Sequence, residues 1–498
     1  MLFNSVDFIG FFLPIVFAGF FTLARVSHRA AAMWLALASL FFYGWWDIRY
    51  VALLVGSITF NYGMGHRLAH SASPSSKKLI LGVSVTCNLL LLGIFKYCDF
   101  LISTINALGG LTIPRTHIVL PLGISFFTFT QIAFLVDVYR QIAKEYRADH
   151  YLLFVTYFPH LIAGPVLHHK QMMPQFAMPD TYSLKTSNVS LGLTIFLIGL
   201  AKKIVLADNL AVFARPVFHA ADAGAAVTFF ESWGGVLAYT FQLYFDFSGY
   251  SDMAIGLSRL FGIELPLNFN SPYKSPTITE FWRRWHITLS HFLRDYIYVP
   301  LGGNRQGKVR RYRNILITML LGGLWHGASW TFVVWGGLHG MYLLIHQSWA
   351  AFKQRWSGSV TVPERSVGRV LGVLVTFGCT VVAWVFFRAE TFPGALAILK
   401  AMLGMNGAIL PDQLAVVLHI KGLVSTTGNM ALLGGGTVMG VFEQAGLLFI
   451  SILICWALPN TQNMSPRLQF WAIVGSFAFV FQAVFFGRAP SEFLYFQF

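Results

Sequence analysis

The chain carries little charge. Only 11% of its 498 residues are Asp, Glu, Lys or Arg, and 56% are hydrophobic, whereas roughly 25% of the residues in a soluble domain are charged. A water-soluble fold is therefore excluded, because a surface so poor in charge suits lipid rather than water. The sequence also lacks a long polar linker that would divide it. We predict a single continuous membrane domain over residues 1–498.

Cysteines and clustered metal ligands are scarce too. No two cysteines have CxxC spacing, and all four lie in or beside apolar segments, which predicts small core residues rather than disulfides. The pair His168-His169 has no acidic or thiol companion at metal-ligand spacing, so we expect no bound metal. The cysteines are Cys87, Cys98, Cys379 and Cys455.

Acidic residues are also few. The chain has 20 of them against 35 Lys and Arg, a net charge of +15, and such an excess suits either nucleic acid or a membrane surface. The basic residues gather at the ends of apolar segments and in one loop, as in cytoplasmic loops that face anionic lipid. We therefore expect membrane lipids as partners and no nucleic acid.

Long apolar runs are abundant. A bilayer core needs about 20 apolar residues per helix, and we expect about 10 to 12 membrane-embedded helices, some of them re-entrant or interfacial. The first of them is expected to be retained, because no basic region or cleavage site precedes it. Residues of about 405–440 have no clear pattern. The predicted segments are Phe8–Ala24, Ala30–Trp46, Val51–Gly65, Leu79–Phe95, His117–Val136, Tyr151–Val166, Val189–Ala207, Thr228–Ile255, Asn314–Ile345, Val370–Phe387, Gly440–Leu458 and Leu468–Phe486.

One of these runs, Asn314–Ile345, has no charged residue but places His326 at the centre of LGGLWHGASW. Its 32 residues would span about 48 Å as one helix, against a bilayer core of about 30 Å. The pairs Gly322-Gly323 and Gly336-Gly337 allow the run to bend or neighbouring helices to approach closely. We expect one long tilted helix or two joined pieces, with His326 inside. From these residues alone, a structural histidine and a catalytic base are equal alternatives.

The segment 272–313 is basic and aromatic. It has nine Lys and Arg, opposed only by Glu280 and Asp295, and an Arg at the bilayer centre costs at least about 2.5–3.5 kcal/mol. The segment at about 270–313 is therefore predicted to lie at the cytoplasmic interface. Its charge attracts anionic lipid or binds a phosphate-bearing cofactor, and both alternatives stay open. The residues for phosphate contact are Lys274, Arg283 and Arg284.

Within this segment, EFWRRW predicts a helix that Thr279 caps. On that helix, residues four apart share a face. Trp282, His286 and Ser290 are then predicted to line one side of it.

Asp246, in FQLYFDFSGYSD, is the third unusual residue, because an intramembrane carboxylate is costly and faces a partner or a cavity. A buried strut for helix packing is the favoured interpretation, and a substrate contact is the alternative. Gln242 and Tyr244 fit either role. Lys202-Lys203 are predicted to extend to an interface.

Several stretches together resemble the membrane-bound O-acyltransferase (MBOAT) family, with an AlgI-like likeness to alginate O-acetylation membrane proteins and a more distant DltB-like one. They follow the family's order along almost the whole chain. They are SLFFYGWWDIRY, LPLGISFFTFTQIAFLVDVY, YFPHLIAGPVLHH, YFDFSGYSDMAIGLSRLFGIELPLNFNSPYKSP, FWRRWHITLSHFLRDYIYVPLGGNR, LLGGLWHGASWTFVVWGGLHG and AWVFFRAETF.

The resemblance implies an all-α polytopic enzyme whose helices enclose a central tunnel. It makes His326, in the WHG motif, the catalytic residue and His286, in the FWRRWH motif, its polar partner. The implied donor is acetyl-CoA on the cytoplasmic side of a bacterial inner membrane. Independently of the resemblance, we expect the basic residues named above to meet its phosphates. The acetyl group then passes outward, through an extracytoplasmic SGNH or esterase-like partner, to hydroxyls of an exported polysaccharide such as alginate or cellulose.

Acyl transfer to a hydroxyl needs a base that takes its proton. Because no Ser or Cys lies in a nucleophile-elbow pattern, we expect direct transfer with His326 as the base and with Trp325 and Trp330 shielding it. Two alternatives remain open. The acceptor is instead a teichoic acid, a lipid or a protein, or the chain is a non-enzymatic polysaccharide-export component.

Overall fold

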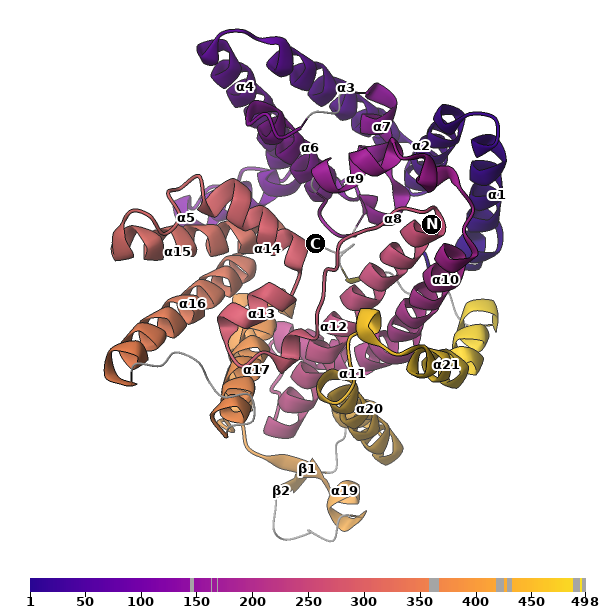
Figure 1. Ribbon diagram of the computed structural model, residues 1–498. Coiled ribbons are helices and arrows are strands. Elements are labelled where there is room, and N and C mark those ends of the chain that lie inside the picture. Colours follow the sequence, from indigo (N-terminus) through magenta and orange to yellow (C-terminus); the bar gives the residue numbers. More distant parts are fainter. Residues whose placement is uncertain are drawn as a thin grey trace. The chain divides into compact units, whose positions relative to one another are not determined.

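A computed structural model describes residues 1–143, 147–162, 164–167, 169–357, 367–417, 425–427, 432–486 and 493–494 (Figure 1). Over these residues the protein is helical apart from its loops and one pair of three-residue strands. The chain divides into two compact units. The first contains Met1–Leu200, Tyr250–Asn268 and Pro466–Phe498, and the second contains Ala201–Gly249 and Phe269–Ser465.

The first unit is built from the helices of the N-terminal 200 residues. The first two α-helices pack on each other, and the third and fourth pack on each other and on the sixth, as Figure 1 shows at its indigo end. Its elements are η1 (Asp7–Phe12), α1 (Leu13–Ala24), α2 (His28–Gly44), α3 (Arg49–His70), α4 (Pro74–Leu92), η2 (Gly93–Tyr97), α5 (Cys98–Gly109), α6 (Ile124–Tyr139), α7 (Ala148–Thr156), α8 (Phe158–Leu161), α9 (His169–Phe176), η3 (Pro179–Tyr182), α10 (Thr186–Ala201), the end of α12 (Phe229–Leu260) and α21 (Pro466–Phe486).

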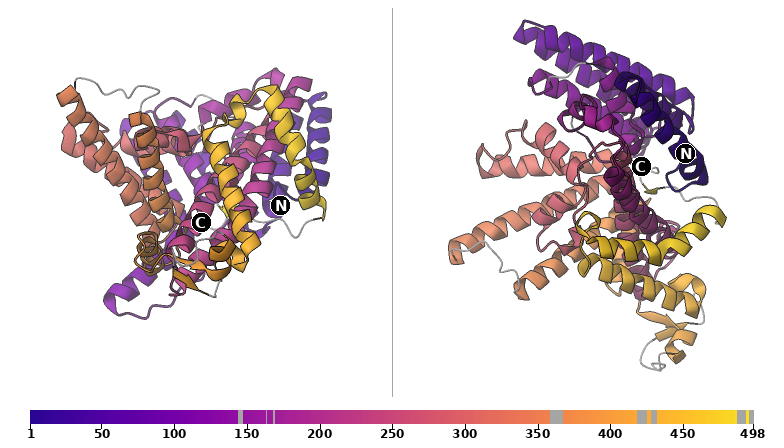
Figure 2. Two further views of the ribbon diagram at one scale, coloured as in Figure 1. Left: turned by 90° about the horizontal axis from the view of Figure 1, so that it is seen from below. Right: turned by 45° about the vertical axis from the view of Figure 1, so that its right-hand side comes forward.

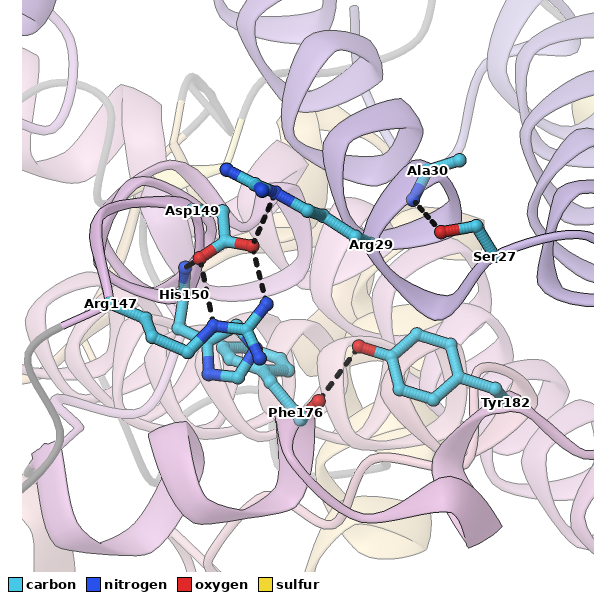
Figure 3. Close-up of polar contacts among 8 residues, drawn as sticks. All are labelled: Ser27, Arg29, Ala30, Arg147, Asp149, His150, Phe176 and Tyr182. Carbon is cyan, nitrogen blue, oxygen red and sulfur yellow. Dashed lines mark hydrogen bonds and ion pairs between the residues drawn. The ribbon is translucent and has the colours of Figure 1, made fainter.

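A buried carboxylate joins two helix starts in this unit (Figure 3). The side chain of Asp149, on α7, is 7% exposed and accepts hydrogen bonds from Arg147, whose Nη2 lies 2.7 Å away. Arg29, at the start of α2, lies 3.4 Å from the same carboxylate. Although burial raises the pKa of Asp149, the hydrogen bonds and charge of Arg147 bring it below its usual value. Two arginines from separate helix starts thus pair with one buried carboxylate.

The second unit holds the remaining helices and the strands. β1 and β2 pair in parallel, with Ile409 opposite Ser425. Its elements are η4 (Lys202–Ala207), α11 (Asp208–Asp222), the first part of α12, η5 (Pro272–Lys274), α13 (Ile278–Arg284), α14 (Ile287–Leu293), η6 (Arg294–Tyr298), α15 (Gly307–His326), α16 (Trp330–Ser357), α17 (Val367–Arg388), α18 (Phe392–Met402), β1 (Ile409–Pro411), α19 (Asp412–Val417), β2 (Ser425–Thr427), η7 (Leu433–Gly436), α20 (Val438–Trp456) and η8 (Thr461–Asn463).

Most predicted apolar segments are helices. One is wrong: Tyr151–Val166 is not a single helix, because the backbone turns away at Tyr157 and Pro159 opens the separate short helix α8. Among the described residues, five helical stretches are long and apolar enough to cross a membrane, fewer than the predicted number of embedded helices, which stays a prediction along with the tunnel. The five are Asp7–Ala24, Pro74–Gly109, Thr186–Asp222, Val367–Arg388 and Val438–Trp456.

The cysteines differ from their predicted role as small core residues. All four are free, but only Cys455 is buried, and Cys87 is exposed. A cysteine on an exposed face of an apolar helix needs no packing partner where lipid replaces water, so apolar surroundings in the sequence did not imply a core position.

The run Asn314–Ile345 folds as two helices, which is one of its two predicted forms. α15 ends at His326 and α16 begins at Trp330. The break lies at residues 327–329 rather than at either glycine pair. There the Oγ of Ser329 accepts a 3.3 Å hydrogen bond from the backbone N–H of Thr331, which satisfies one of the free amides at a helix start.

The glycine pairs serve close approach instead of bending. A Cβ on Gly323 would collide with the carbonyl oxygen of Phe332 and lie 3.1 Å from the Cα of Gly336, and a Cβ on Gly336 would collide with the carbonyl oxygen of Met319. Backbone atoms cannot turn away as a side chain can, so these positions accept only glycine. Figure 2 shows α15 and α16 side by side as a result.

A buried ion pair crosses the second unit. The Nζ of Lys203 lies 2.7 Å from Asp246 and 2.8 Å from Asp208, and the side chains of Lys203 and Asp246 are each 2% exposed. Lys202 is also buried and donates a 2.7 Å hydrogen bond to Thr461. The prediction that both lysines extend to an interface is therefore wrong, because a carboxylate on α12 and a hydroxyl lie within their reach. Asp246 has the ion-pair partner that a packing strut requires.

We expect Lys203→Met to lower the melting temperature of the detergent-purified protein. Removing one partner of a buried pair leaves the other charge uncompensated and costs about 3–5 kcal/mol. Adding Asp246→Asn to Lys203→Met should recover part of the loss, measured by thermal unfolding. A double variant less stable than Lys203→Met alone would show that the pair is not the source of the effect.

We expect Gly323→Ala and Gly336→Ala to destabilise the protein by about 1–3 kcal/mol or more each, because the added methyl group meets backbone on the facing helix. The matched control is Gly337→Ala, whose Cβ would meet only the Cδ2 of Leu320 at 3.6 Å, an ordinary contact. Thermal unfolding should separate the control from the other two variants. Equal melting temperatures for all three would contradict the close helix contact.

Candidate active site

His326 is the last residue of α15 and lies at the tip of the α15–α16 hairpin. Its side chain is 3% exposed. Three aromatic rings enclose it edge-on: Trp325 at 4.9 Å, Trp335 at 5.0 Å and Phe387 of α17 at 5.2 Å between ring centroids. Aromatic rings from three helices, α15, α16 and α17, therefore surround the imidazole.

His286 lies between two short helices. The backbone at His286 has φ 42° and ψ 55°, a left-handed conformation that costs a non-glycine residue about 1–3 kcal/mol. The residue is fully buried, and the ring of Phe247 on α12 contacts it edge-on at 4.7 Å. The predicted continuous helix through Trp282, His286 and Ser290 is therefore wrong. The break turns the His286 side chain off the face of α13 and against α12.

The two histidines that the sequence singled out lie together. Their ring centroids are 6.4 Å apart with the planes at 58°, and Trp325 contacts both rings. Two buried imidazoles at this separation can hold one proton-exchanging group between them, with aromatic rings excluding water from it. Strain at one of the two positions is typical of functional sites.

Helix capping differs from its prediction. Thr277, not Thr279, caps α13, because its side chain accepts a 3.2 Å hydrogen bond from the backbone N–H of Glu280. The Thr279 hydroxyl instead lies 2.9 Å from Nδ1 of His346 on α16. Ser290 donates to the carbonyl oxygen of Trp285, so its hydroxyl is used in capping the turn.

The predicted phosphate contacts do not gather at the histidines. Lys274 donates a 2.6 Å hydrogen bond to the carbonyl oxygen of Leu458, and Arg284 pairs with Glu280 at 2.5 Å. Arg283 is exposed. These three side chains therefore point to separate neighbours, and a common phosphate site stays a prediction.

Three of the remaining predicted residues, Trp282, Tyr244 and Asp246, pack on or adjoin neighbours of the two histidines. Trp282 packs edge-on against Trp335 at 5.9 Å, and Tyr244 lies 6.4 Å from Trp285, the neighbour of His286. Asp246 adjoins Phe247 in sequence and is held by Lys203, so its carboxylate fixes the helix that contacts His286. Gln242 is half-buried.

Sequence reasoning missed the main wall of His326. It selected Trp330, which is 55% exposed, whereas Trp335 is 1% exposed and contacts the imidazole. The helix is interrupted at residues 327–329, so helical periodicity does not continue from α15 into α16. The sequence separation from His326 therefore could not predict which of Trp330 and Trp335 faces the imidazole. Phe387, in the AWVFF stretch, carried no signal beyond its family motif.

The comparisons with known proteins agree on one family. Residues 125–358 match the sequence profile of the MBOAT, membrane-bound O-acyltransferase family. The whole chain is 40% identical to the peptidoglycan O-acetyltransferase of Helicobacter pylori and covers 98% of it. It is 44% identical, over 81% of its length and 80% of the relative's, to the probable alginate O-acetylase AlgI of Pseudomonas putida.

A more distant likeness has the same character. The teichoic acid D-alanyltransferase of Streptococcus thermophilus is 28% identical over 53% of this chain and 68% of its own length. The predicted acyltransferase activity and all-α polytopic fold are thereby confirmed. The chain belongs to the membrane-bound O-acyltransferase family and is a multi-pass membrane O-acetyltransferase.

Proposed function

We propose that the protein transfers an acetyl group from cytoplasmic acetyl-CoA to a hydroxyl of a cell-envelope polysaccharide, with His326 as the catalytic base. The pairing of His326 with His286 at 6.4 Å, inside a shell of aromatic rings, carries the proposal. A buried imidazole beside a second one suits a reaction whose only mobile charge is a proton.

The transfer is direct in this proposal. As the hydroxyl oxygen bonds to the acetyl carbon, His326 takes the hydroxyl proton, and the carbon–sulfur bond breaks. The proton then passes to the departing thiolate. His286 orients the reacting group from the other side, and the aromatic rings of Trp325, Trp335 and Phe387 keep out water that would hydrolyse the thioester.

Peptidoglycan is the acceptor that the comparisons favour, because the relative of that name matches the chain over its whole length. Alginate is the second candidate, supported by a higher identity over about four fifths of the chain. In both cases the acceptor lies outside the cytoplasm, so the acetyl group has to cross the inner membrane. Where an extracytoplasmic esterase-like partner takes part, the hydroxyl acetylated at His326 is the partner's, and the partner then passes the acetyl group to the polysaccharide.

We expect His326→Ala to lower acetyl transfer by about 10²- to 10⁴-fold, the contribution of a positioned general base. The measurement is alkali-released acetate from the envelope polysaccharide of cells that carry only the variant. His291→Ala, which alters an exposed histidine on α14, is the matched control and should keep wild-type acetate. If His326→Ala inserts, melts normally and still supports full acetylation, His326 is not the base.

The acceptor is identified by deleting the gene and analysing each polymer by mass spectrometry. We expect O-acetyl groups to disappear from peptidoglycan and to return with the wild-type gene but not with His326→Ala. Loss from an exopolysaccharide, with peptidoglycan unchanged, would move the assignment to an alginate-type acceptor.

A further inference from the structure

A third histidine lies beside the proposed site and has no assigned role. His339, on α16, is fully buried, and neither its Nδ1 nor its Nε2 has a hydrogen-bond partner among the residues that the structure describes. Two other histidines, one buried and one half-buried, do have hydrogen-bond partners. His160 contacts the carbonyl oxygen of Phe154 at 2.8 Å, and His346 contacts the Thr279 hydroxyl at 2.9 Å.

The surroundings of His339 are aromatic. Its ring stacks on Phe281 at 6.0 Å and meets Trp282 at 5.2 Å and Trp335 at 4.8 Å edge-on. Tyr342 and Trp384 lie at 5.9 and 6.0 Å. If packing were the only demand on this position, a phenylalanine or leucine would fill it at lower free energy, because an unsatisfied buried polar group is destabilising.

Two rings that contact His339 share this lack of partners. The indole Nε1 atoms of Trp282 and Trp335 are buried and also lack partners within the described part of the chain. With His339, these two rings form a triangle whose centroids are 4.8 to 5.9 Å apart. Buried polar groups are almost always hydrogen-bonded, so three such rings together point to a guest that supplies the missing bonds.

The triangle adjoins the paired histidines. Trp335 contacts His326 at 5.0 Å and His339 at 4.8 Å, both edge-on. Trp282 belongs to α13, which ends two residues before His286. A guest bound there is therefore held by α16, which directly follows the helix that ends at His326, and by α13, which directly precedes His286.

The donor and acceptor groups define the guest. Each indole N–H only donates, while a neutral imidazole donates one hydrogen bond and accepts another. The guest has to accept up to three hydrogen bonds and donate one. A secondary amide meets all but one of these demands, because its carbonyl oxygen accepts two bonds and its N–H donates one, and its flat apolar flanks suit aromatic walls.

We propose that His339, Trp282 and Trp335 form a binding site for a secondary amide of a substrate. The proposal rests on the proposed function, which supplies two sources of that amide. One is the pantetheine arm of the thioester donor, and the other is the N-acetyl group of an amino-sugar acceptor. The site holds the substrate one aromatic ring away from His326.

The test is binding to the detergent-purified full chain, measured as the ligand-dependent rise in melting temperature. The probes are pantetheine, with a triethylene glycol thiol as its amide-free counterpart, and tetra-N-acetylchitotetraose, with cellotetraose as its counterpart. One amide-containing probe should raise the melting temperature, and its counterpart should not. The probe that succeeds identifies the donor or the acceptor as the source.

His339→Phe should weaken the apparent affinity for that probe by about tenfold or more, because the hydrogen bonds to a buried group are lost. The unliganded variant should melt no lower than the wild type, since a ring of similar shape replaces an unsatisfied imidazole. Trp282→Phe, which keeps a ring but removes the N–H, gives a second reading and should weaken binding too. His346→Phe, on the same helix, is the matched control and should keep wild-type affinity.

The proposal is overturned if neither amide-containing probe stabilises the wild type, or if His339→Phe and Trp282→Phe bind it as tightly as the wild type does. Failure of the proposed function is a separate result. In that case His326→Ala cells keep their polysaccharide acetate, whatever the melting temperatures of the His339 variants.

Discussion

The position of His326 depends on the close backbone contact between α15 and α16. Gly323 and Gly336 place the two helices so near that carbonyl oxygens of one occupy the space of a side chain on the other. His326 is one turn beyond Gly323, and Trp335 precedes Gly336. The contact that joins the helices therefore also sets the base against its aromatic wall, without a side chain between them that could relax.

Buried polar side chains of the second unit have two kinds of surroundings. Lys203 and Asp246 neutralise each other at 2.7 Å and fix η4 to α12. The histidines use aromatic rings instead, which surround an imidazole without satisfying all of its nitrogens. The ion pair is complete without a substrate, whereas His339 is not, and this difference separates a structural polar group from one that awaits a ligand.

Much of the fold was predictable from the sequence, because helices in lipid have to be long, apolar and self-satisfied. Their ends were less predictable. The break at residues 327–329 and the left-handed turn at His286 depend on tertiary contacts with α16 and α12, which no local pattern records. For the same reason the sequence identified both histidines by their motifs but mistook Trp330 for the shielding ring.

Lys202 and Lys203 illustrate a further limit. Two adjacent lysines after an apolar helix suggest an interface when read along the chain. Their partners, Thr461 and Asp246, are 259 and 43 residues away. The sequence did indicate that the buried Asp246 carboxylate needs a partner. It could not identify Lys203 as that partner, because the two residues are far apart in the chain.

The hairpin formed by α15 and α16 has a consequence for how the protein enters the membrane. The hydroxyls of Tyr312 and Ser348 lie 3.3 Å apart near the open end of the hairpin. Because α16 returns along α15, the arginines at the start of α15 and Arg355 near the end of α16 lie at the same end of the hairpin. A hairpin of this form can enter the membrane with His326 leading, without moving an arginine of either helix across. His326 then enters at the turn of the hairpin, while the basic residues at the other end remain on the side from which the hairpin entered.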